Sequence, residues 1–188
     1  MYKEYSPCSV LAPFIYHFWE YKGETRSGLK FNIPPHGCSD LVFIVGNAAD
    51  CIRNSLIMKP YHSYFFGPMN TFTELVAHTN FIHIIGVRFR PCGLFQFIEI
   101  PLNELANQGI DSQEFPVLFS QSFIYQLCES NQNPIDIIEH ELVRQVYKNN
   151  MDTEKQISYA VSLISRQKGI VSIKELAAEA CLCLRQFE

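Results

Sequence analysis

The sequence contains no long apolar run: none of its hydrophobic stretches reaches the roughly 18 residues that a membrane-spanning helix requires. Residues 1–5 (Met-Tyr-Lys-Glu-Tyr) also lack the apolar core of a secretion signal. We therefore expect no membrane partner and a cytoplasmic protein. Hydrophobic residues make up 47% of the chain and charged residues 18%, a composition that excludes intrinsic disorder and suits one or two folded domains.

Motifs for metal binding and catalysis are missing as well. The six histidines include no His-x-His pair and the seven cysteines no Cys-x-x-Cys pair, so the usual ligand spacings are absent. His36 and Asp40 could converge with His62 or His78 from other strands, but nothing in their spacing requires it. No nucleophile–base pair or glycine-rich phosphate loop stands out. We expect no metal, no other cofactor and no enzyme activity, and we interpret the cysteines as reduced thiols packed among apolar side chains.

An excess of positive charge is also missing. The net charge is −4, whereas a surface that binds nucleic acid has to be basic to neutralise phosphates. The charges are unevenly distributed: residues 153–188 hold five Lys and Arg against four Asp and Glu, and residues 1–152 hold ten against fifteen. Only the C-terminal part is therefore electrostatically compatible with DNA.

The first half of the chain has the pattern of short strands separated by turn residues such as Pro34-Pro35 and Gly46-Asn47. Residues 41–45 form a continuous apolar run, which is typical of a strand buried on both faces. The predicted strands are residues 14–21, 29–33, 41–45, 55–58, 64–66, 71–77 and 81–89. Short strands of this kind indicate an all-β barrel or sandwich.

The second half of the chain changes to helical spacing. Asn133-Pro134 is a typical helix start, with Asn as the cap and Pro at the first helical position. Apolar residues then recur every three or four positions at Ile135, Ile138, Leu142 and Val146. We expect residues 1–150 to form one α+β domain, because strands and covering helices together make a single layered core. The domain boundary is predicted in residues 149–152.

Residues 153–188 have the pattern of a helix-turn-helix. Thr153 and Ser172 each begin a capping box, and Gly169 ends the first helix. After Ser172 we expect a short helix, a brief break and a second short helix that carries Arg185 and Gln186. An ordinary helical hairpin has the same spacing, so the spacing alone leaves both interpretations open. The predicted apolar stripe of the first helix consists of Ile157, Ala160, Val161 and Ile164.

The C-terminal motif resembles the start of the AraC-type DNA-binding domain. The resemblance is carried by Ile157-x-x-Ala160-x-x-x-Ile164, by Gly169-x-Val171-Ser172-Ile173-x-Glu175-Leu176-Ala177, and by residues 181–188. In that family this region forms the first of two helix-turn-helix motifs. The resemblance makes Arg185 and Gln186 the candidate DNA-binding residues. Cys183 replaces a serine at the start of the recognition helix, and Cys is a poorer helix cap.

The N-terminal part is similar to a set of regulators in the same family. The matching segments are Pro35-His36-Gly37-x-x-Asp40-Leu41-Val42-Phe43, Phe66-Gly67-Pro68, Gly86-Val87-Arg88-Phe89-Arg90-Pro91-x-Gly93-Leu94 and Pro101-Leu102-x-Glu104-Leu105. The resemblance implies an α+β fold: a small cupin-like β-barrel followed by helices, then the start of an all-α helix-turn-helix domain. It also implies a sensing or oligomerisation role, with a small-molecule effector and a homodimer as expected partners.

The resemblance implies a longer protein. A relative would continue for roughly another 80 to 100 residues through a second motif, whereas this sequence stops at Glu188. We therefore expect residues 153–188 to be an incomplete DNA-binding domain, and we expect DNA to be a partner of the full-length protein only.

Two alternatives remain open for the residues that could bind an effector. Arg88 and Arg90 should point to one face of a strand, where they could hold an anionic ligand or pair with Asp40 or Glu20 inside the protein. Aromatic residues around positions 16–21 and 64–66 could line a pocket or fill the barrel core. The candidate ligand-binding residues are His36, Asp40, Arg88, Arg90 and Trp19.

The preferred hypothesis is a DNA-binding transcriptional regulator. Residues 1–150 would sense a signal, and a ligand would act by binding two arrangements of the protein with different affinity. The alternative is a stand-alone module of cupin-like fold that binds a small molecule or a protein without binding DNA. A barrel enzyme is the third hypothesis, which the stoichiometric metal content of the purified protein would test.

Overall fold

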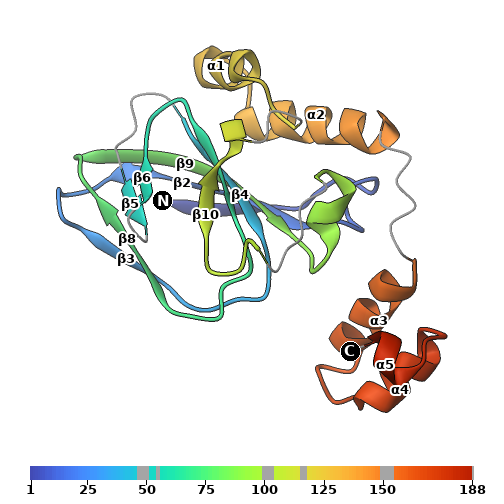
Figure 1. Cartoon of the computed structure of the whole chain (residues 1–188). Helices are drawn as coiled ribbons and strands as arrows, with labels where there is room; N and C mark the ends of the chain where they lie inside the picture. Colours follow the sequence, from blue (N-terminus) through green and yellow to red (C-terminus); the bar gives the residue numbers. More distant parts are fainter. Residues whose placement is uncertain (46–50, 54–55, 99–103, 115–117, 149–154, 188) are drawn as a thin grey trace. The chain divides into compact units, whose positions relative to one another are not determined.

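The computed structural model describes residues 1–45, 51–53, 56–98, 104–114, 118–148 and 155–187 (Figure 1). The chain divides into two units, Met1–Asn149 and Asn150–Glu188. Among the described residues, no helix is both long enough and apolar enough to cross a membrane.

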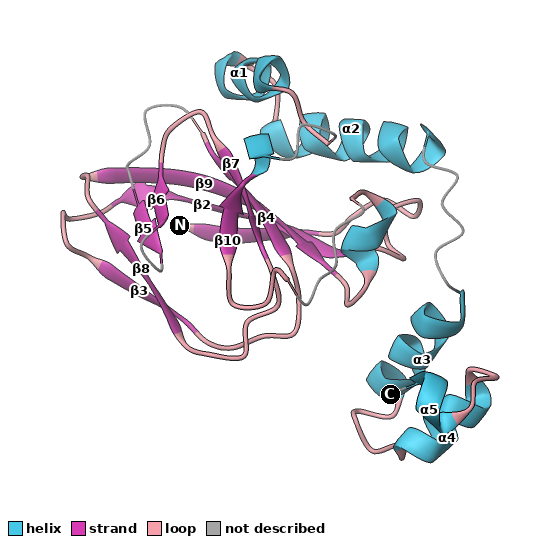
Figure 2. Cartoon of the chain, in the orientation of Figure 1, coloured by secondary structure: helices cyan, strands magenta, loops and turns pink. Residues whose placement is uncertain are grey.

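The first unit contains strands that form two antiparallel sheets (Figure 2). The larger sheet has the order β1-β2-β9-β4-β7-β10 and the smaller sheet the order β3-β8-β5-β6. The strands of the larger sheet are β1 (Tyr2–Tyr5), β2 (Ile15–Glu24), β9 (Phe81–Phe89), β4 (Asp40–Ile44), β7 (Ser63–Phe66) and β10 (Gly109–Asp111). The strands of the smaller sheet are β3 (Lys30–Ile33), β8 (Thr73–Ala77), β5 (Cys51–Arg53) and β6 (Leu56–Met58).

The α+β class agrees with the sequence-based prediction, but the closed cupin-like barrel is not confirmed. No ladder of backbone hydrogen bonds joins the two sheets of the described strands into a single closed sheet. Each of the seven predicted strands corresponds to a strand in the structure, and β4 is buried along its whole length. Strands β1, β5 and β10 were not predicted, because they are short and have no clear apolar alternation.

One face of the larger sheet packs against helices α1 (Gln121–Glu129) and α2 (Pro134–Lys148), which lie together over the sheet in Figure 1. Asn133 caps α2 as predicted, since its Oδ1 accepts a hydrogen bond from the Ile135 amide at 3.1 Å. Two short 3₁₀ helices, η1 (Gly93–Gln96) and η2 (Ser112–Glu114), connect strands and helices. The core between sheet and helices includes Phe18, Leu41, Phe65, Val87, Ile138 and Leu142.

The other face of the larger sheet is directed toward the smaller sheet. Side chains alternate between the two faces of a strand, so neighbouring residues of β4, β7 and β9 belong to different clusters. This second cluster includes Val42, Ile44, Tyr64, Phe66, Ile82 and Ile84, with Phe31, Met58 and Leu75 from the smaller sheet. The larger sheet is therefore covered on both faces, which explains its continuous apolar runs.

The second unit consists of helices α3 (Lys155–Arg166), α4 (Ile173–Glu179) and α5 (Leu184–Phe187). Ser172 and Glu175 form the predicted capping box at the start of α4. Gly169 follows α3 with φ of 79°, and its amide donates to the Ile164 carbonyl at 2.9 Å, so it terminates the helix as predicted. The predicted capping box at Thr153 and the linker at 149–152 lie outside the described residues.

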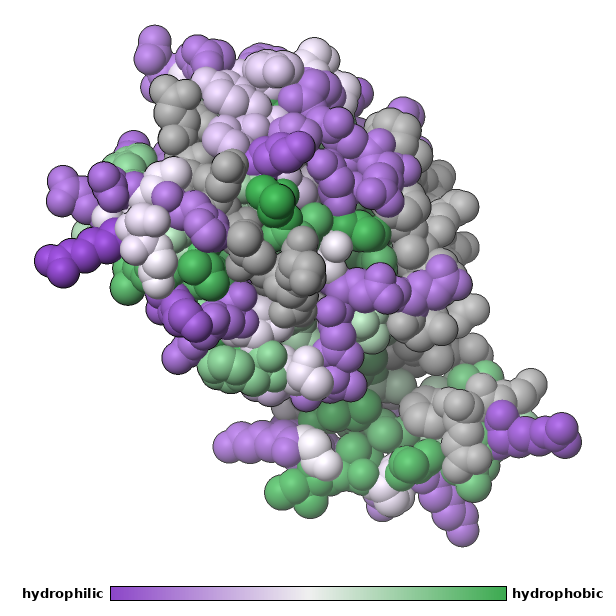
Figure 3. Space-filling view, turned by 60° about the vertical axis from the view of Figure 1, so that its left-hand side comes forward, coloured by the Kyte–Doolittle hydropathy of each residue, from purple (hydrophilic) through white to green (hydrophobic). Residues whose placement is uncertain are grey.

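The second unit has a small core in which Ala160, Leu176 and Ala180 are buried and Leu163 packs against them. The predicted apolar stripe is wrong at Ile164, which is 38% exposed. Helices this short bury little surface among themselves. Apolar side chains therefore remain on the surface of this unit, as the green areas at the bottom of Figure 3 show.

Candidate functional site

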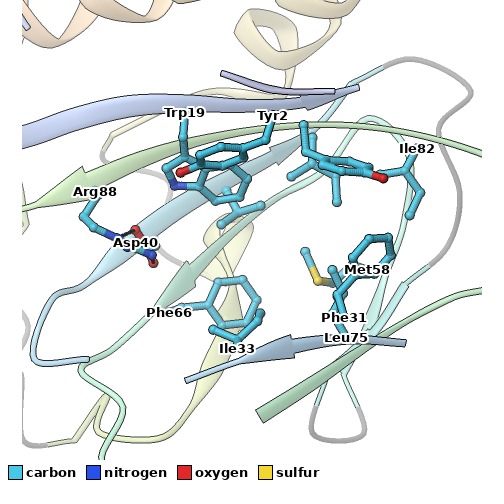
Figure 4. A pocket seen from close by; sticks show the side chains of 13 residues that line it. Tyr2, Trp19, Phe31, Ile33, Asp40, Met58, Phe66, Leu75, Ile82 and Arg88 are labelled. Atoms are coloured by element: carbon cyan, nitrogen blue, oxygen red, sulfur yellow. Dashed lines mark hydrogen bonds and ion pairs between the residues drawn. The ribbon is translucent and has the colours of Figure 1, made fainter. Parts of the chain in front are cut away.

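A cavity of about 220 Å³ lies in the first unit between the two sheets. Its aromatic lining residues are Tyr2, Trp19, Tyr21, Phe31 and Phe66, and its aliphatic and thioether lining residues are Ile33, Val42, Met58, Leu75, Ile82 and Ile84. Asp40 and Arg88 complete the lining and lie together at one end of the cavity (Figure 4). An apolar cavity with few polar groups is the usual form of a small-molecule site.

Strand periodicity places these side chains around one space. On β9, Ile82, Ile84 and Arg88 line the cavity, and Gly86 occupies the remaining position on that face. The intervening residues of β9, such as Val87, point into the core beneath the helices. The same alternation puts Asp40 and Val42 of β4 on the cavity side.

Trp19 fills the space above Gly86. The two residues face each other on adjacent antiparallel strands, and a Cβ atom added to Gly86 would lie 1.9 Å from Cε2 of the indole. Only glycine therefore allows Trp19 to adopt its position over the sheet. The indole Nε1 is buried and has no hydrogen-bond acceptor among the described residues, although a buried N–H group of this kind normally has one.

Arg88 and Asp40 form a bidentate ion pair between β9 and β4. The Nε and Nη2 groups of Arg88 donate to Oδ1 and Oδ2 of Asp40, each at 2.9 Å. The side chain of Asp40 is 3% exposed and that of Arg88 is 27% exposed. Burial acts against the charge of Arg88, but its hydrogen bonds and charge interaction with Asp40 outweigh burial and raise the pKa of Arg88. Of the two roles predicted for Arg88, pairing with Asp40 within the protein is confirmed.

The structure brings together three of the five predicted ligand-binding residues, Trp19, Asp40 and Arg88, at the cavity. His36 is not among the residues that line the cavity, but it contacts the ion pair: its Nε2 is 3.5 Å from Asp40 Oδ2 and 3.4 Å from Arg88 Nη2. Arg90 lies beyond the end of β9, where its Nε donates to the Ala12 carbonyl at 2.8 Å and its guanidinium covers the Tyr16 ring. Arg90 therefore does not line the cavity beside Arg88, and it contacts Ala12 and Tyr16 instead of the predicted partners Asp40 or Glu20, because β9 ends one residue before it. A role of Arg90 in ligand binding stays a prediction.

Tyr2 is a cavity residue that sequence reasoning missed. It lies on β1, and its ring stacks on Trp19 with 6.4 Å between ring centroids. Its hydroxyl donates to Glu4 Oε1 at 2.8 Å. Burial and this hydrogen bond raise the pKa of Tyr2 to about 12, so the hydroxyl keeps its proton at neutral pH. No strand pattern marks residues 2–5, so the sequence offered no signal for this residue.

Apolar lining residues of β3 and β9 were also missed as site residues, but a signal for them existed. Phe31 and Ile33 alternate with polar residues on β3, and Ile82 and Ile84 share one face of β9. That alternation predicted strands, but it did not indicate which faces would meet around a cavity.

The two predicted DNA-binding residues lie on α5. The turn before this helix contains Cys181 with φ of 56°, a left-handed conformation of the kind that ends a helix. Arg185 is exposed. Gln186 is in the same helix, but its side chain is outside the part of the structure that is described.

Metal-binding groups do not converge in the described part of the chain. No set of three or more His, Cys, Asp or Glu side chains there is arranged to hold a metal ion. Both oxygens of Asp40, a candidate to converge with His36 and with His62 or His78, accept hydrogen bonds from Arg88.

Comparison with known proteins gives a family match and weak similarity to solved structures. The family model DUF6597, described as a domain of unknown function, matches residues 3–111. No curated protein matches the chain significantly. Among solved structures, the AraC-like transcriptional activator CuxR is similar with a TM-score of 0.36 and 14% sequence identity. The similarity covers 90% of this chain and 64% of CuxR.

Proposed function

The chain belongs to the DUF6597 family, and from this premise we propose that it is the sensing part and the beginning of the DNA-binding part of a transcriptional regulator. In this proposal the first unit binds a small effector between its sheets. The second unit contributes the first helix-turn-helix, and Arg185 and Gln186 contact DNA. We further propose that the protein is not an enzyme.

The observation that carries the DNA-binding proposal is the corner between α4 and α5. A capped helix, a tight turn and a second helix with an exposed Arg are the parts of a helix-turn-helix motif. Ala177 is 3% exposed, and a small residue at such a position lets two helices approach closely. The AraC-type sequence pattern of residues 157–188 supports the same proposal.

A footprint on the DNA upstream of its own gene tests this function. The protein encoded by the complete reading frame should protect a discrete site at a stated salt concentration, because affinity for DNA depends strongly on salt. Arg185→Ala should weaken binding to that site by roughly tenfold or more if the side chain contacts a base. Arg26→Ala, which removes an exposed Arg from the first unit, is the matched control and should leave binding unchanged. Equal binding by both variants would exclude Arg185 from the DNA contact, and no protection at all would remove the regulator proposal.

The second candidate function is a small-molecule-binding module without DNA binding. The apolar cavity supports it, because this site does not depend on the second unit. Ligand binding combined with no DNA protection by the complete protein would favour this candidate.

A further inference from the structure

Two cysteines of the second unit differ from the expectation that the cysteines pack among apolar side chains. Cys181 and Cys183 lie in the loop between α4 and α5 (Figure 1), and both are exposed. The other cysteines whose side chains the structure describes are half-buried: Cys8, Cys38, Cys92 and Cys128. A thiol reacts with an oxidant in solution only when the oxidant can reach it, so the loop between α4 and α5 holds the most accessible thiols of the described part of the chain.

Burial makes the half-buried thiols less reactive as well. It raises the pKa of Cys38 and of Cys92, and the thiolate rather than the thiol is the nucleophile. In the sequence, no other two cysteines are as close together as Cys181 and Cys183. An oxidised sulfur at either position therefore has a second thiol beside it.

The backbone conformation at Cys181 does not explain why a cysteine stands there. The Cys181 amide donates to the Ala178 carbonyl at 3.1 Å and the Leu182 amide to the Ala177 carbonyl at 2.9 Å. These two hydrogen bonds are the pattern that ends a helix with one left-handed residue. Cys181 is that residue, with φ of 56°. Glycine is the usual residue at this position, because a Cβ atom is unfavourable in the left-handed conformation.

The position of Cys183 also favours another residue. Cys183 directly precedes α5 and so occupies the cap position, where Ser, Thr, Asp or Asn is preferred. Leu182, between the two cysteines, packs against the small core that contains Leu176, which accounts for an apolar residue at that position alone. Residues that depart from local preference are expected at functional sites.

The spacing lets the two thiols form one disulfide. Two Cα atoms separated by one intervening residue are at most about 7 Å apart, and a disulfide joins Cα atoms that are about 4.4–6.8 Å apart. Only a small adjustment of the loop is therefore needed. A disulfide that closes so short a loop at an exposed position is strained, and strained or exposed disulfides are the readily reduced ones.

We propose that Cys181 and Cys183 are a modification site at which a hydroperoxide oxidises the two thiols to an intramolecular disulfide. One thiolate attacks a peroxide oxygen, so that an S–O bond forms, the O–O bond breaks and the second oxygen leaves as hydroxide or alkoxide. The other thiolate attacks the resulting sulfenic acid, so that the S–S bond forms and the S–O bond breaks with loss of hydroxide. The thiols lose two electrons and two protons in total, and hydrogen peroxide is reduced to two molecules of water.

The disulfide changes the loop that orients α5. Its ring restricts the backbone from Cys181 to Cys183, directly before the helix that carries Arg185. Leu176 of α4 is 5% exposed and Leu184 of α5 is 46% exposed, so α5 is packed less tightly and is the helix that moves. Oxidation therefore weakens DNA binding. This consequence rests on the proposed function, whereas the formation of the disulfide does not.

One tryptic peptide reports the modification. Cleavage after Lys174 and Arg185 releases residues 175–185, which contain Cys181 and Cys183 and no other cysteine. The 188-residue chain is exposed to a small excess of hydrogen peroxide, and the remaining thiols are then alkylated. The peptide should resist alkylation and be two hydrogen atoms lighter than its reduced form, and dithiothreitol should reverse both changes. The disulfide should form roughly tenfold faster than Cys38 or Cys92 is oxidised.

Three results would overturn the modification site. The first is a peptide 175–185 that is still alkylated at both cysteines after oxidation. The second is sulfinic acid in this peptide in place of the disulfide. The third is a disulfide-linked dimer, which would show that the two thiols react between molecules.

Two variants each remove one thiol while preserving the loop. Cys181→Gly introduces the residue preferred at the left-handed position, and Cys183→Ser introduces a better cap for α5. Both variants should fold and lose the disulfide. Cys8→Ser removes a half-buried thiol of the first unit and is the control, which should oxidise like the original chain. An alkylation-resistant peptide 175–185 at unchanged yield in Cys181→Gly or Cys183→Ser would contradict the pairing.

The footprint of the complete protein tests the consequence for DNA. Oxidation should weaken protection roughly tenfold, about the loss of one base contact, and dithiothreitol should restore it. Cys183→Ser should protect the site equally before and after oxidation. The disulfide without protection by the reduced protein would retain the modification site and overturn the regulator, whereas protection without any disulfide would do the reverse. Protection that stays the same when the disulfide has formed would overturn the effect on α5.

Discussion

The indole of Trp19 occupies the position that a side chain at Gly86 would need, with only 1.9 Å between its Cε2 and an ideal Cβ at Gly86. The largest side chain therefore lies over the smallest residue on the adjacent strand, and the Trp19 ring forms part of the cavity wall. It also places the only Trp of the chain at the proposed ligand site.

Replacing Gly86 with Ala should displace the indole and destabilise the first unit. Forcing an extra methyl group into a packed site costs typically about 1–3 kcal/mol, and we expect a loss in that range by urea denaturation. The fluorescence of Trp19 should change in the folded variant as well. Gly37→Ala is the control, because a Cβ at Gly37 would meet nothing within 4 Å. An unchanged unfolding midpoint in Gly86→Ala would show that the strands adjust without strain.

Asp40→Asn should remove the charge partner of Arg88 and destabilise the first unit by about 3 kcal/mol, since breaking a largely buried ion pair leaves the other charge uncompensated. The double variant Asp40→Leu with Arg88→Met should recover part of this loss, and a double-mutant cycle would measure the coupling. The pair of Glu141 and Arg144 on α2, in which the Arg144 side chain is 60% exposed and that of Glu141 15%, provides the comparison. Arg144→Gln should change stability by less than about 1 kcal/mol. Equal losses from Asp40→Asn and Arg144→Gln would contradict the importance of burial.

The first unit should lose stability as the pH falls below neutrality, in part through His83 and Glu20, whose Nε2 and Oε1 are 2.8 Å apart. Burial lowers the pKa of His83. Burial alone would raise the pKa of Glu20, but hydrogen bonds from His83 and Tyr5 outweigh it and lower that pKa.

The direction of this change in stability with pH follows from proton binding in the folded and unfolded states. In both cases the unfolded chain binds the proton more readily than the folded protein, so folding is favoured at higher pH. The contribution of His83 is complete above its unfolded pKa of 6.5, and that of Glu20 above its unfolded pKa of 4.5; each is lost as the pH falls through the lowered folded value. Urea titrations across this range should show a smaller pH dependence for His83→Gln than for the exposed His78→Gln. A steeper dependence in His83→Gln would refute this assignment.

Ser172→Ala should destabilise the second unit without affecting the first. The variant removes the hydroxyl that accepts from the Glu175 amide at 3.1 Å, and losing such a cap costs typically about 1 kcal/mol. Amide hydrogen exchange in α4 should accelerate, while exchange in β9 should not change. Ser162→Ala is the matched control, because its hydroxyl donates to the Tyr159 carbonyl within its own helix and is not a cap. Equal exchange rates in the two variants would mean that the capping box contributes little.

Local chemistry was sufficient to predict most elements and several of their ends. The caps at Asn133 and Ser172, the helix end at Gly169 and the fully buried strand β4 depend on neighbouring residues and on periodicity, so they can be derived from the sequence. The sequence left two roles open for Arg88, binding an anionic ligand or pairing with an acidic residue of the chain. The pairing with Asp40 could be foreseen because a buried charge needs an opposite charge nearby.

The arrangement of the strands in space could be decided only by the tertiary structure. Which faces of β3, β8 and β9 enclose a cavity depends on long-range pairing, and the contribution of Tyr2 depends on an edge strand that has no sequence pattern. Arg90 and Arg88 have the same spacing as two residues on one face, yet the chain turns away after Phe89 and separates their roles. Periodicity describes a side chain relative to its own strand, whereas a site requires the positions of several strands relative to one another.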